Sequence, residues 1–313
     1  MKPKNIFITG GTGCVGKYLL NLLLASSDAT LHLLVRTASR LDSFYKNHPQ
    51  IKFYSGTVDA IEKHKDLVSS CDVVVHIATS WCDNDSAMKT NCEKTLELFK
   101  IAEEGLCQKI IYFSTASILN DKNELNPEAY EVGPMYIKSK YRAHEEIEKL
   151  NYKTPIYTVY PTLVLGGDSN IYYTHISGGI KNYHRYIRFL RFFSVNGACH
   201  FIHTRDIAEI VWFLIGHNVK QRKFVLGQKR LTIKNAIQEA TDACGFKNLF
   251  QIPINTKFIV FLTKIFRIKL DPWGMYCLKN SEQTYRATDP SELDLTNHFP
   301  TFRQAVEDIE GIR

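Results

Sequence analysis

The chain has 313 residues, a mass of 35.9 kDa and a formal net charge of +7. Hydrophobic residues make up 44% of it and charged residues 23%, which are ordinary values for a globular protein. This composition excludes a mainly disordered or fibrous protein, and no apolar run reaches the roughly 18 residues of a membrane-spanning helix. The eight cysteines are scattered without a Cys-x-x-Cys pair, so we expect reduced thiols, a cytoplasmic protein and no metal site.

Short apolar runs alternate with helix-length segments along the first half of the chain. The runs are typical of strands buried on both faces: "NIFIT" (5–9), "LHLLV" (31–35), "IKFYS" (51–55), "DVVVHIA" (72–78), "KIIYFS" (109–114), "IYTVYP" (156–161) and "KFVLG" (223–227). The helix-length segments between them are "VGKYLLNLLLAS", "MKTNCEKTLELFKIAEEG" and "YIKSKYRAHEEIEKL". This alternation predicts an α/β fold with a doubly wound parallel sheet of the Rossmann type.

Gly10, Gly13 and Gly16 form a G-x-x-G-x-x-G pattern between the first predicted strand and the first predicted helix. Such a turn lets a pyrophosphate approach backbone N–H groups at the positive end of a helix, although glycine turns without a ligand also occur here. The second strand ends in "LLVRTASR", where Arg36, assisted by Arg40, suits the 2′-phosphate of NADP. We therefore predict NADP(H) as the preferred cofactor, with NAD(H) as the alternative.

The alternation fades after Pro161 and returns with "FIHTRDIAEIVWFLI". Residues 229–313 are predicted to be largely helical, with breaks at Pro253, Pro272, Pro290 and Pro300. We predict a dinucleotide-binding Rossmann domain of residues 1–165 and 199–228. Residues 166–198 and 229–313 would form a smaller, mostly helical substrate-binding lobe.

Tyr136 and Lys140 lie four residues apart, on one face of the predicted helix that follows the fifth strand. About one such pair is expected by chance in this composition, so its position matters more than its presence. The fifth strand ends in "FSTAS", which puts Thr115 and Ser117 at the carboxyl edge of the sheet. Ligands of open α/β sheets bind at that edge, so we expect Thr115, Tyr136 and Lys140 to share a site.

Several motifs follow one another along nearly the whole chain: "TGGTGCVG", "VVVHIAT", "TNCEKTLELFKIAEE", "IYFSTASIL", "YIKSK", "YPTLVLGG" and "FIHTRDIAE". In this order they resemble an extended short-chain dehydrogenase/reductase of the NAD-dependent epimerase/dehydratase family. The resemblance implies that Tyr136 is the general acid/base. Lys140 would bind the nicotinamide ribose and lower the pKa of the phenol, Thr115 would hold the reacting oxygen, and Asn91 would support the site.

The same resemblance implies where the cofactor is bound. The implied contacts are Gly10, Gly13, Cys14, Val15, Gly16, Arg36, Ala78, Tyr136, Lys140 and Pro161. We predict an NADP(H)-dependent oxidoreductase that interconverts a carbonyl and an alcohol on a small molecule by hydride transfer. The alternatives are a nucleotide-sugar epimerase or dehydratase that uses a bound dinucleotide for internal redox, and a non-catalytic NADP(H)-binding protein.

Two further segments are relevant to what the protein binds. "KNYHRYIRFLRFF" (181–193) is predicted to be an amphipathic helix whose arginines and aromatics suit an anionic, apolar or ring-shaped substrate, or else pack and face solvent. "KFIVFLTKIFRIKL" (257–270) is interpreted as a lobe helix, with an interfacial membrane helix as the alternative. We expect a small-molecule substrate and neither nucleic-acid nor membrane contact, and the resemblance implies a homodimer as an alternative to a monomer.

Overall fold

The computed structural model describes residues 2–36, 42–183, 187–247, 250–255, 258, 260, 265 and 271–312. It divides into two compact units. Unit 1 comprises Met1–Ile118, Pro134–Pro161 and Ile207–Phe224, and unit 2 comprises Leu119–Gly133, Thr162–Asp206 and Val225–Arg313. The assignment of cofactor binding and substrate binding to separate domains stays a prediction.

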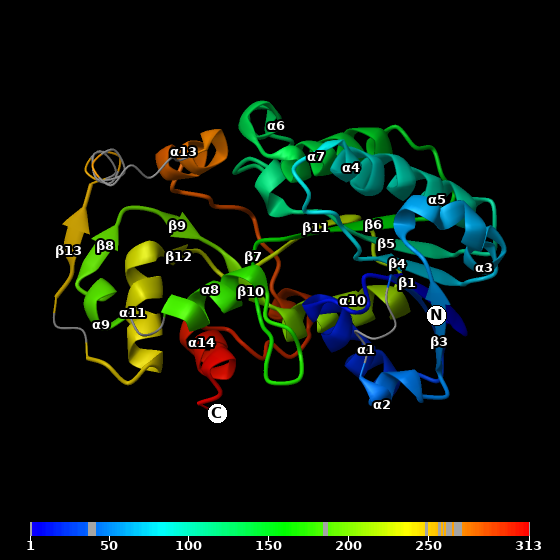
Figure 1. The fold of residues 1–313 in the computed structure, drawn as a ribbon, viewed down its shortest axis with the longest axis horizontal. Helices are drawn as coiled ribbons and strands as arrows, with labels where there is room; N and C mark the ends of the chain where they lie inside the picture. Colours follow the sequence, from blue (N-terminus) through cyan, green and yellow to red (C-terminus); the bar gives the residue numbers. More distant parts are fainter. Residues whose placement is uncertain are drawn as a thin grey trace. The chain divides into compact units, whose positions relative to one another are not determined.

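The seven predicted apolar runs join one seven-stranded sheet with the order β11-β6-β5-β4-β1-β2-β3 (Figure 1). They are β1 (Asn5–Thr9), β2 (Thr30–Val35), β3 (Ile51–Ser55), β4 (Val73–His76), β5 (Lys109–Phe113), β6 (Ile156–Pro161) and β11 (Lys223–Leu226). The return to this sheet expected at "FIHTRD" was wrong, because residues 201–203 pair in a separate two-stranded sheet. The pairings that join β6 through to β3 are parallel, which confirms the predicted doubly wound sheet. Because β1 pairs with both β2 and β4, the strand order reverses there, and such a switch point is where open sheets bind ligands.

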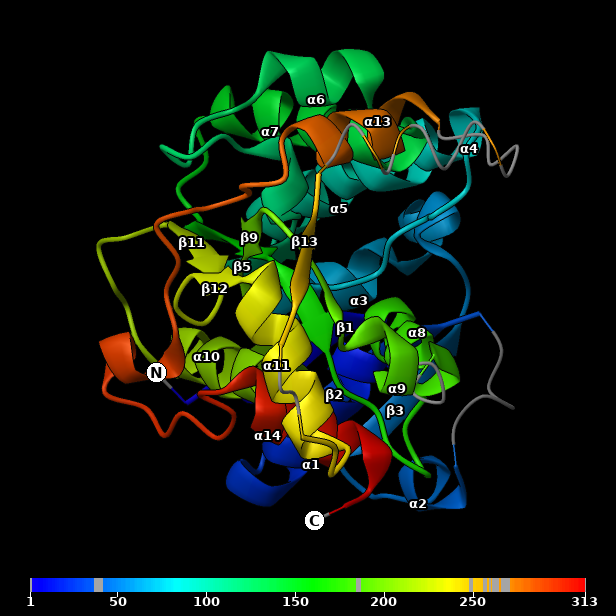
Figure 2. The same cartoon turned by 90° about the vertical axis from the view of Figure 1, so that its left-hand side faces the viewer.

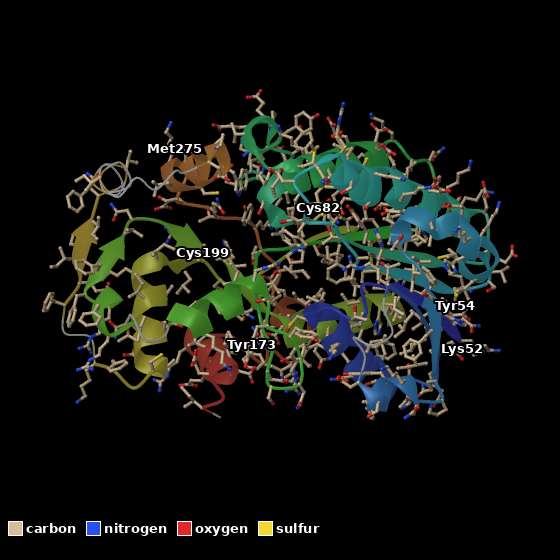
Figure 3. All side chains as sticks on the ribbon, in the orientation of Figure 1. Lys52, Tyr54, Cys82, Tyr173, Cys199 and Met275 are labelled. Carbon is tan, nitrogen blue, oxygen red and sulfur yellow. The ribbon has the colours of Figure 1, made fainter. Side chains whose placement is uncertain are left out.

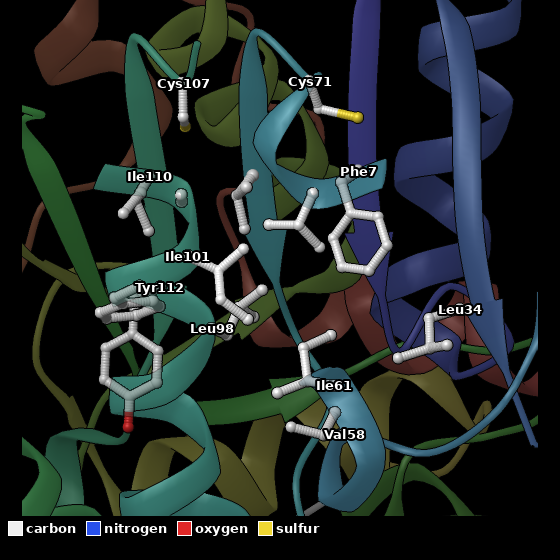
Figure 4. Packing of buried hydrophobic residues seen from close by; sticks show 14 of the residues in the cluster. Phe7, Leu34, Val58, Ile61, Cys71, Leu98, Ile101, Cys107, Ile110 and Tyr112 are labelled. Atoms are coloured by element: carbon white, nitrogen blue, oxygen red, sulfur yellow. The ribbon is translucent and has the colours of Figure 1, made fainter. Parts of the chain in front are cut away.

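Helices cover both faces of this sheet, with α1 and α10 on one face and α5 and α7 on the other (Figure 1). The helical elements of this part are α1 (Cys14–Ser26), α2 (Ser43–Lys46), η2 (Val58–His64), α3 (Lys65–Ser69), α4 (Asp85–Met88), η3 (Lys89–Glu93), α5 (Lys94–Glu103), η4 (Ala116–Ile118), α7 (Met135–Glu148) and α10 (Thr204–Gly216). Phe7 and Ile110 from the sheet pack with Leu98 and Ile101 of α5 in the core (Figure 4). Burial of the strands on both faces explains their continuous apolar sequences.

Unit 2 contains short strand pairs and helices. Its strands pair as β7 (Leu163–Leu165) with β10 (Phe201–His203), β9 (Ala198–Cys199) with β12 (Leu231–Thr232), and β8 (Phe193–Val195) with β13 (Ile252–Ile254). Its helices are α6 (Pro127–Val132), α8 (His175–Tyr183), α9 (Ile187–Leu190), α11 (Ile233–Ala243), α13 (Pro272–Lys279), η6 (Pro290–Leu293) and α14 (Phe302–Glu310). In one cluster of its core, Leu165 and Phe201 pack against Ala305 and Ile309 of α14.

The structure corrects two local predictions in unit 2. Residues 181–193 do not form one helix to their end, since Phe193 begins β8, and Arg185 lies outside the described residues. Residues 252–254 form strand β13 within a segment predicted to be largely helical. Pro253 does interrupt the helical pattern there, and Pro272 begins a new helix, α13, because the first turn needs no N–H donor. Within the described ranges, no helix is both long and apolar enough to cross a bilayer.

Candidate active site

At two positions of the loop between β1 and α1, a side chain would collide with neighbouring backbone atoms. Gly10 has a φ of +76°, and a Cβ on it would lie 2.6 Å from the backbone nitrogen of Ala78. A Cβ on Gly16 would collide with the Gly10 carbonyl. Gly13 differs, because the nearest atom to a Cβ there is the Gly10 carbonyl oxygen, at 3.4 Å. The absence of a side chain at Gly13 therefore fits the close approach of a ligand rather than chain packing.

Helix α1 starts directly at this loop. Its first residue is Cys14, and its N-cap is Gly13, which has no side chain to cap the helix. The N–H groups of the first turn, which include those of Val15 and Gly16, therefore present the positive end of the helix dipole toward the loop. The residues present thus fit the pyrophosphate of a dinucleotide.

The other implied cofactor residues also lie along the carboxyl edge of the sheet. Arg36 directly follows β2, and its side chain is exposed, whereas Arg40 lies outside the described residues. The Ala78 N–H donates to Thr9 Oγ1 at 3.2 Å, which fixes the segment after β4 against the end of β1. Pro161 is the last residue of β6.

His76 is the last residue of β4, at the switch point of the strand order between β1 and β4. It pairs with Thr9 in the strand register, and its Nδ1 lies 2.7 Å from Thr9 Oγ1, while its Nε2 lies 2.9 Å from Thr95 Oγ1. Burial lowers the pKa of His76 to about 3. His76 is therefore a neutral core residue with both ring nitrogens hydrogen-bonded.

Tyr136 and Lys140 lie in the first two turns of α7, on one face as predicted. The Lys140 side chain is buried, and its Nζ donates to the Phe113 carbonyl at 2.7 Å and to the Tyr112 hydroxyl at 3.4 Å. Burial lowers the pKa of Lys140 to about 7. The lysine is therefore held at the carboxyl end of β5 and changes protonation near neutral pH.

The Tyr136 phenol lies beside Thr115, two residues beyond the end of β5. Burial raises the pKa of Tyr136 to about 12, and a hydrogen bond with the Thr115 side chain acts in the opposite direction. Thr115 is itself buried, and its hydroxyl accepts a hydrogen bond from the Ser117 N–H at 3.3 Å. The structure thus places the Tyr136 phenol beside Thr115 and holds the Lys140 ammonium at the carbonyl of Phe113, two residues before Thr115. A contact of Lys140 with the phenol, and a lowering of the phenol pKa by it, stay predictions.

Asn91 lies in the π-helical turn η3, a type of turn that is frequent at functional sites. Its buried Oδ1 accepts from the Ser80 N–H at 2.7 Å and from the Thr79 hydroxyl at 3.0 Å. Its Nδ2 donates to the Ser80 carbonyl at 2.8 Å and to Ser139 Oγ at 3.0 Å. Since the Ser139 hydroxyl donates to the Tyr136 carbonyl at 2.8 Å, Asn91 joins the segment after β4 to the first turn of α7. This position fits the supporting role implied for Asn91.

Trp81 was not singled out from the sequence, yet its indole stacks on Tyr136. The ring centroids are 3.9 Å apart and the planes are 20° apart. The Trp81 side chain is 59% exposed, so the indole shields one face of the phenol. Asp83 Oδ1 accepts from the Met135 N–H at 2.9 Å and so ties this segment, labelled at Cys82 in Figure 3, to the start of α7. Trp81 and Tyr136 are far apart in sequence, so no sequence pattern indicated this contact. Ser139, in contrast, lies three residues after Tyr136 on the same helix, and helical spacing could have identified it.

The family description "NAD dependent epimerase/dehydratase family" matches residues 6–227. Among curated proteins, an uncharacterized membrane protein of Methanocaldococcus jannaschii is 30% identical over 130 residues, which is 39% of each chain. The chain therefore matches about two fifths of the length of that relative.

Solved structures resemble the chain over nearly its whole length. The Bordetella bronchiseptica enzyme WbmG in complex with NAD and UDP has a TM-score of 0.71 at 15% identity, over 99% of this chain and 94% of that one. UDP-N-acetylglucosamine 4-epimerase from Methanobrevibacter ruminantium has a TM-score of 0.67 at 16% identity, over 100% of both chains. These likenesses confirm the Rossmann-like fold. Because the family match runs from β1 to the end of β11 and includes the helix of Tyr136 and Lys140, this protein belongs to the NAD-dependent epimerase/dehydratase family.

Proposed function

We propose that this protein epimerises a hydroxyl-bearing carbon of a nucleotide-linked sugar by reversible hydride transfer. The observation that carries the proposal is the Tyr136 phenol beside Thr115, next to buried Lys140 at the carboxyl edge of the sheet. The family and the similarity to a UDP-N-acetylglucosamine 4-epimerase support this alternative better than the net carbonyl reduction that we favoured from sequence. Substrate binding by residues 166–198 and 229–313 belongs to the same proposal.

In this mechanism the Tyr136 phenolate takes the proton of the substrate hydroxyl while its carbon is oxidised, and returns that proton when the carbonyl is reduced again. The Thr115 hydroxyl donates to the same oxygen and holds it in place. The bound dinucleotide supplies the hydride acceptor and donor. Lys140 favours the phenolate by its positive charge, and Asn91 and Trp81 hold the phenol in position.

The chain has groups suited to the pyrophosphate and to the nicotinamide ribose of a dinucleotide. The first turn of α1, with Gly10, Gly13 and Gly16, would hold the pyrophosphate. Lys140 would bond the nicotinamide ribose. We assign NAD or NADP to this site on the fit of these groups, and the similar WbmG structure contains NAD.

Epimerisation needs fewer acid–base groups than dehydration does. Loss of water from the sugar would need a second acid–base pair near the reacting carbon. The residues that follow Thr115 are Ala116, Ser117 and Ile118, none of which has a carboxyl or imidazole group. We place epimerisation ahead of dehydration on the similarity to a UDP-N-acetylglucosamine 4-epimerase.

The test uses the purified protein without added cofactor. Mass spectrometry of the denatured protein should release NAD or NADP, and NMR should show a C4 epimer forming from UDP-N-acetylglucosamine or UDP-glucose. Internal redox predicts no net build-up of reduced nicotinamide during turnover. Absence of any epimer, together with consumption of added NADPH in proportion to a reduced carbonyl substrate, would instead establish the reductase.

One observation favours that reductase as a second candidate. Exposed Arg36 stands at the end of β2, where a guanidinium suits the 2′-phosphate of NADP. A net reduction consumes NADPH, which would bind and leave in each turnover as a co-substrate. Retention of the cofactor therefore discriminates the two candidates: a dinucleotide that stays bound through purification would fit the epimerase, and an exchangeable NADP site would point to the reductase.

A further inference from the structure

Two segments of unit 2 are rich in cations and contain no acidic residue. Residues 171–193 and 243–270 together include nine Lys and Arg: Lys181, Arg185, Arg188, Arg191, Lys247, Lys257, Lys264, Arg267 and Lys269. Neither segment contains Asp or Glu, although the chain has 32 of them. These nine cations exceed the net charge of +7, so the rest of the chain has a slight excess of acids. The positive charge of the protein is thus concentrated in these two segments.

The fold brings residues 192–195 of the first segment and residues 250–254 of the second side by side, whereas Arg185, Lys257, Lys264, Arg267 and Lys269 lie outside the described residues. Strand β8 pairs with β13 in parallel, with Phe193 opposite Ile252 (Figures 1 and 2). The Ile252 N–H donates to the Phe192 carbonyl at 2.8 Å, and the rings of Phe192 and Phe250 stack with centroids 5.2 Å apart. Residues 192–195 and 250–254 are therefore neighbours, although they are far apart in sequence.

Large apolar side chains on this surface face outward. The exposed fractions are 67% for Phe189, 41% for Phe193, 58% for Phe250 and 51% for Ile252. We call these four residues the apolar patch. Ser194, which alternates with Phe193 along β8, is buried, as expected for a strand with an inner and an outer face. Phe193 and Ile252 are direct partners in the β8–β13 register, and neighbouring exposed apolar side chains are typical of an interaction site.

Cations border the apolar patch. Arg188, next to Phe189 in α9, and Lys247, just before β13, are both exposed. Arg191 Nη1 donates to the Lys247 carbonyl at 2.7 Å, and its guanidinium lies 4.6 Å from the centre of the Phe192 ring. The surface therefore combines broad apolar groups with positive charge and no carboxylate from either segment.

We propose that the apolar patch docks on an anionic membrane surface. Phe189, Phe193, Phe250 and Ile252 enter the boundary between head groups and acyl chains, and Arg188 and Lys247 bind the negative head groups. A second copy packed through the same surface would bring Arg188 and Lys247 of both copies together, and these like charges would repel. An anionic bilayer offers an apolar interior to the apolar patch and negative head groups to the cations beside it. This inference does not depend on the proposed function, and it reverses the expectation from sequence that the protein makes no membrane contact.

The test is sedimentation of the full chain with phosphatidylcholine vesicles and with vesicles that also contain phosphatidylglycerol. Binding should require the anionic lipid and should weaken as salt is raised. The double variant Phe189→Ser/Ile252→Thr should bind the anionic vesicles at least about tenfold more weakly, because it loses apolar area. Arg188→Gln/Lys247→Gln should weaken binding by about tenfold or more, since each cation near such a surface contributes about fivefold.

Matched controls keep the test specific to this surface. Leu106→Ser removes another exposed apolar side chain, and Lys122→Gln/Lys149→Gln removes two exposed charges in other places, so both variants should bind like the unmutated protein. Circular dichroism and the thermal midpoint check that every variant is folded. Failure of the unmutated chain to bind anionic vesicles overturns the proposal, as does equal loss of binding in the control variants. Concentration-dependent dimers that only the Phe189→Ser/Ile252→Thr variant abolishes, without vesicle binding, would make the surface a contact between copies.

Discussion

At Tyr136 and Lys140 burial acts on groups of opposite charge type. It raises the pKa of the phenol to about 12 and lowers that of the lysine to about 7, because the charged form of each is disfavoured away from water. A phenol in this state is a poor base at neutral pH. Positive charge brought close to the phenol, by protonated Lys140 or by an oxidised nicotinamide, would lower its pKa toward the working range.

The pKa of Lys140 also predicts how stability depends on pH. Between the pKa of about 7 in the folded chain and its usual value of 10.5, the unfolded chain binds more protons, so stability rises with pH through this range. Lys140→Met should remove this contribution. Urea denaturation from neutral to mildly alkaline pH should therefore show the unmutated protein gaining stability relative to the variant. Parallel stability curves for the two proteins would contradict the buried state of Lys140.

Trp81 should act on catalysis through Tyr136. Trp81→Ala would expose one face of the phenol, so the pH limb of turnover that reports Tyr136 should move to lower pH, and kcat should fall more than KM rises. Trp81→Phe keeps an aromatic ring and should retain most of the activity. The measurement is the pH–rate profile of both variants. An unchanged pH–rate profile in Trp81→Ala would contradict an effect of the indole on the pKa of Tyr136.

At the scale of elements, a buried lysine joins strand β5 to the end of α10. Lys109 Nζ donates to the carbonyls of Leu214, Ile215 and His217, at 2.5, 3.2 and 2.6 Å. Leu214 and Ile215 belong to the last turn of α10, whose carbonyls a helix leaves unpaired, and His217 directly follows the helix. A positive charge at this end also stabilises the helix dipole. Burial nevertheless lowers the pKa of Lys109 to about 8.

Lys109→Met keeps the apolar length of the side chain but leaves those carbonyls without their donor. We expect a loss of about 2 to 4 kcal/mol in the free energy of unfolding. The control is Lys149→Met, which removes an exposed ion pair with Glu146 and should cost less than about 1 kcal/mol. Equilibrium unfolding in urea measures both variants. Equal effects at the two positions would refute the capping role of Lys109.

The sequence was most informative where one element carries its own pattern. Continuous apolar runs located the strands of the sheet, and helical spacing placed Tyr136 and Lys140 on one face. Contacts between elements left no such pattern, so the stacking of Trp81 on Tyr136 was not anticipated. Phe193 was assigned to a helix because its aromatic, basic surroundings suit an amphipathic helix, whereas pairing with Ile252 places it in a strand.

At the scale of the whole molecule, Arg36 bears on which dinucleotide the protein prefers. Arg36 predicts that NADP(H) binds more tightly than NAD(H), by roughly 2 to 3 kcal/mol, the size of a charge-assisted contact with phosphate. Arg36→Asp should remove most of this difference. Fluorescence titration of the cofactor-free protein with both dinucleotides measures it, and equal affinities in the unmutated protein would contradict a role for Arg36 in binding phosphate.

The central claim is that Tyr136 moves the proton in the reaction of this protein. The most direct measurement compares turnover of the nucleotide sugar by the unmutated protein and by Tyr136→Phe, with cofactor affinity measured on the same samples. Phenylalanine keeps the ring and its stacking on Trp81 but has no transferable proton. We expect turnover to fall by at least about a hundredfold while cofactor affinity changes little. Near-normal turnover in Tyr136→Phe would contradict the account.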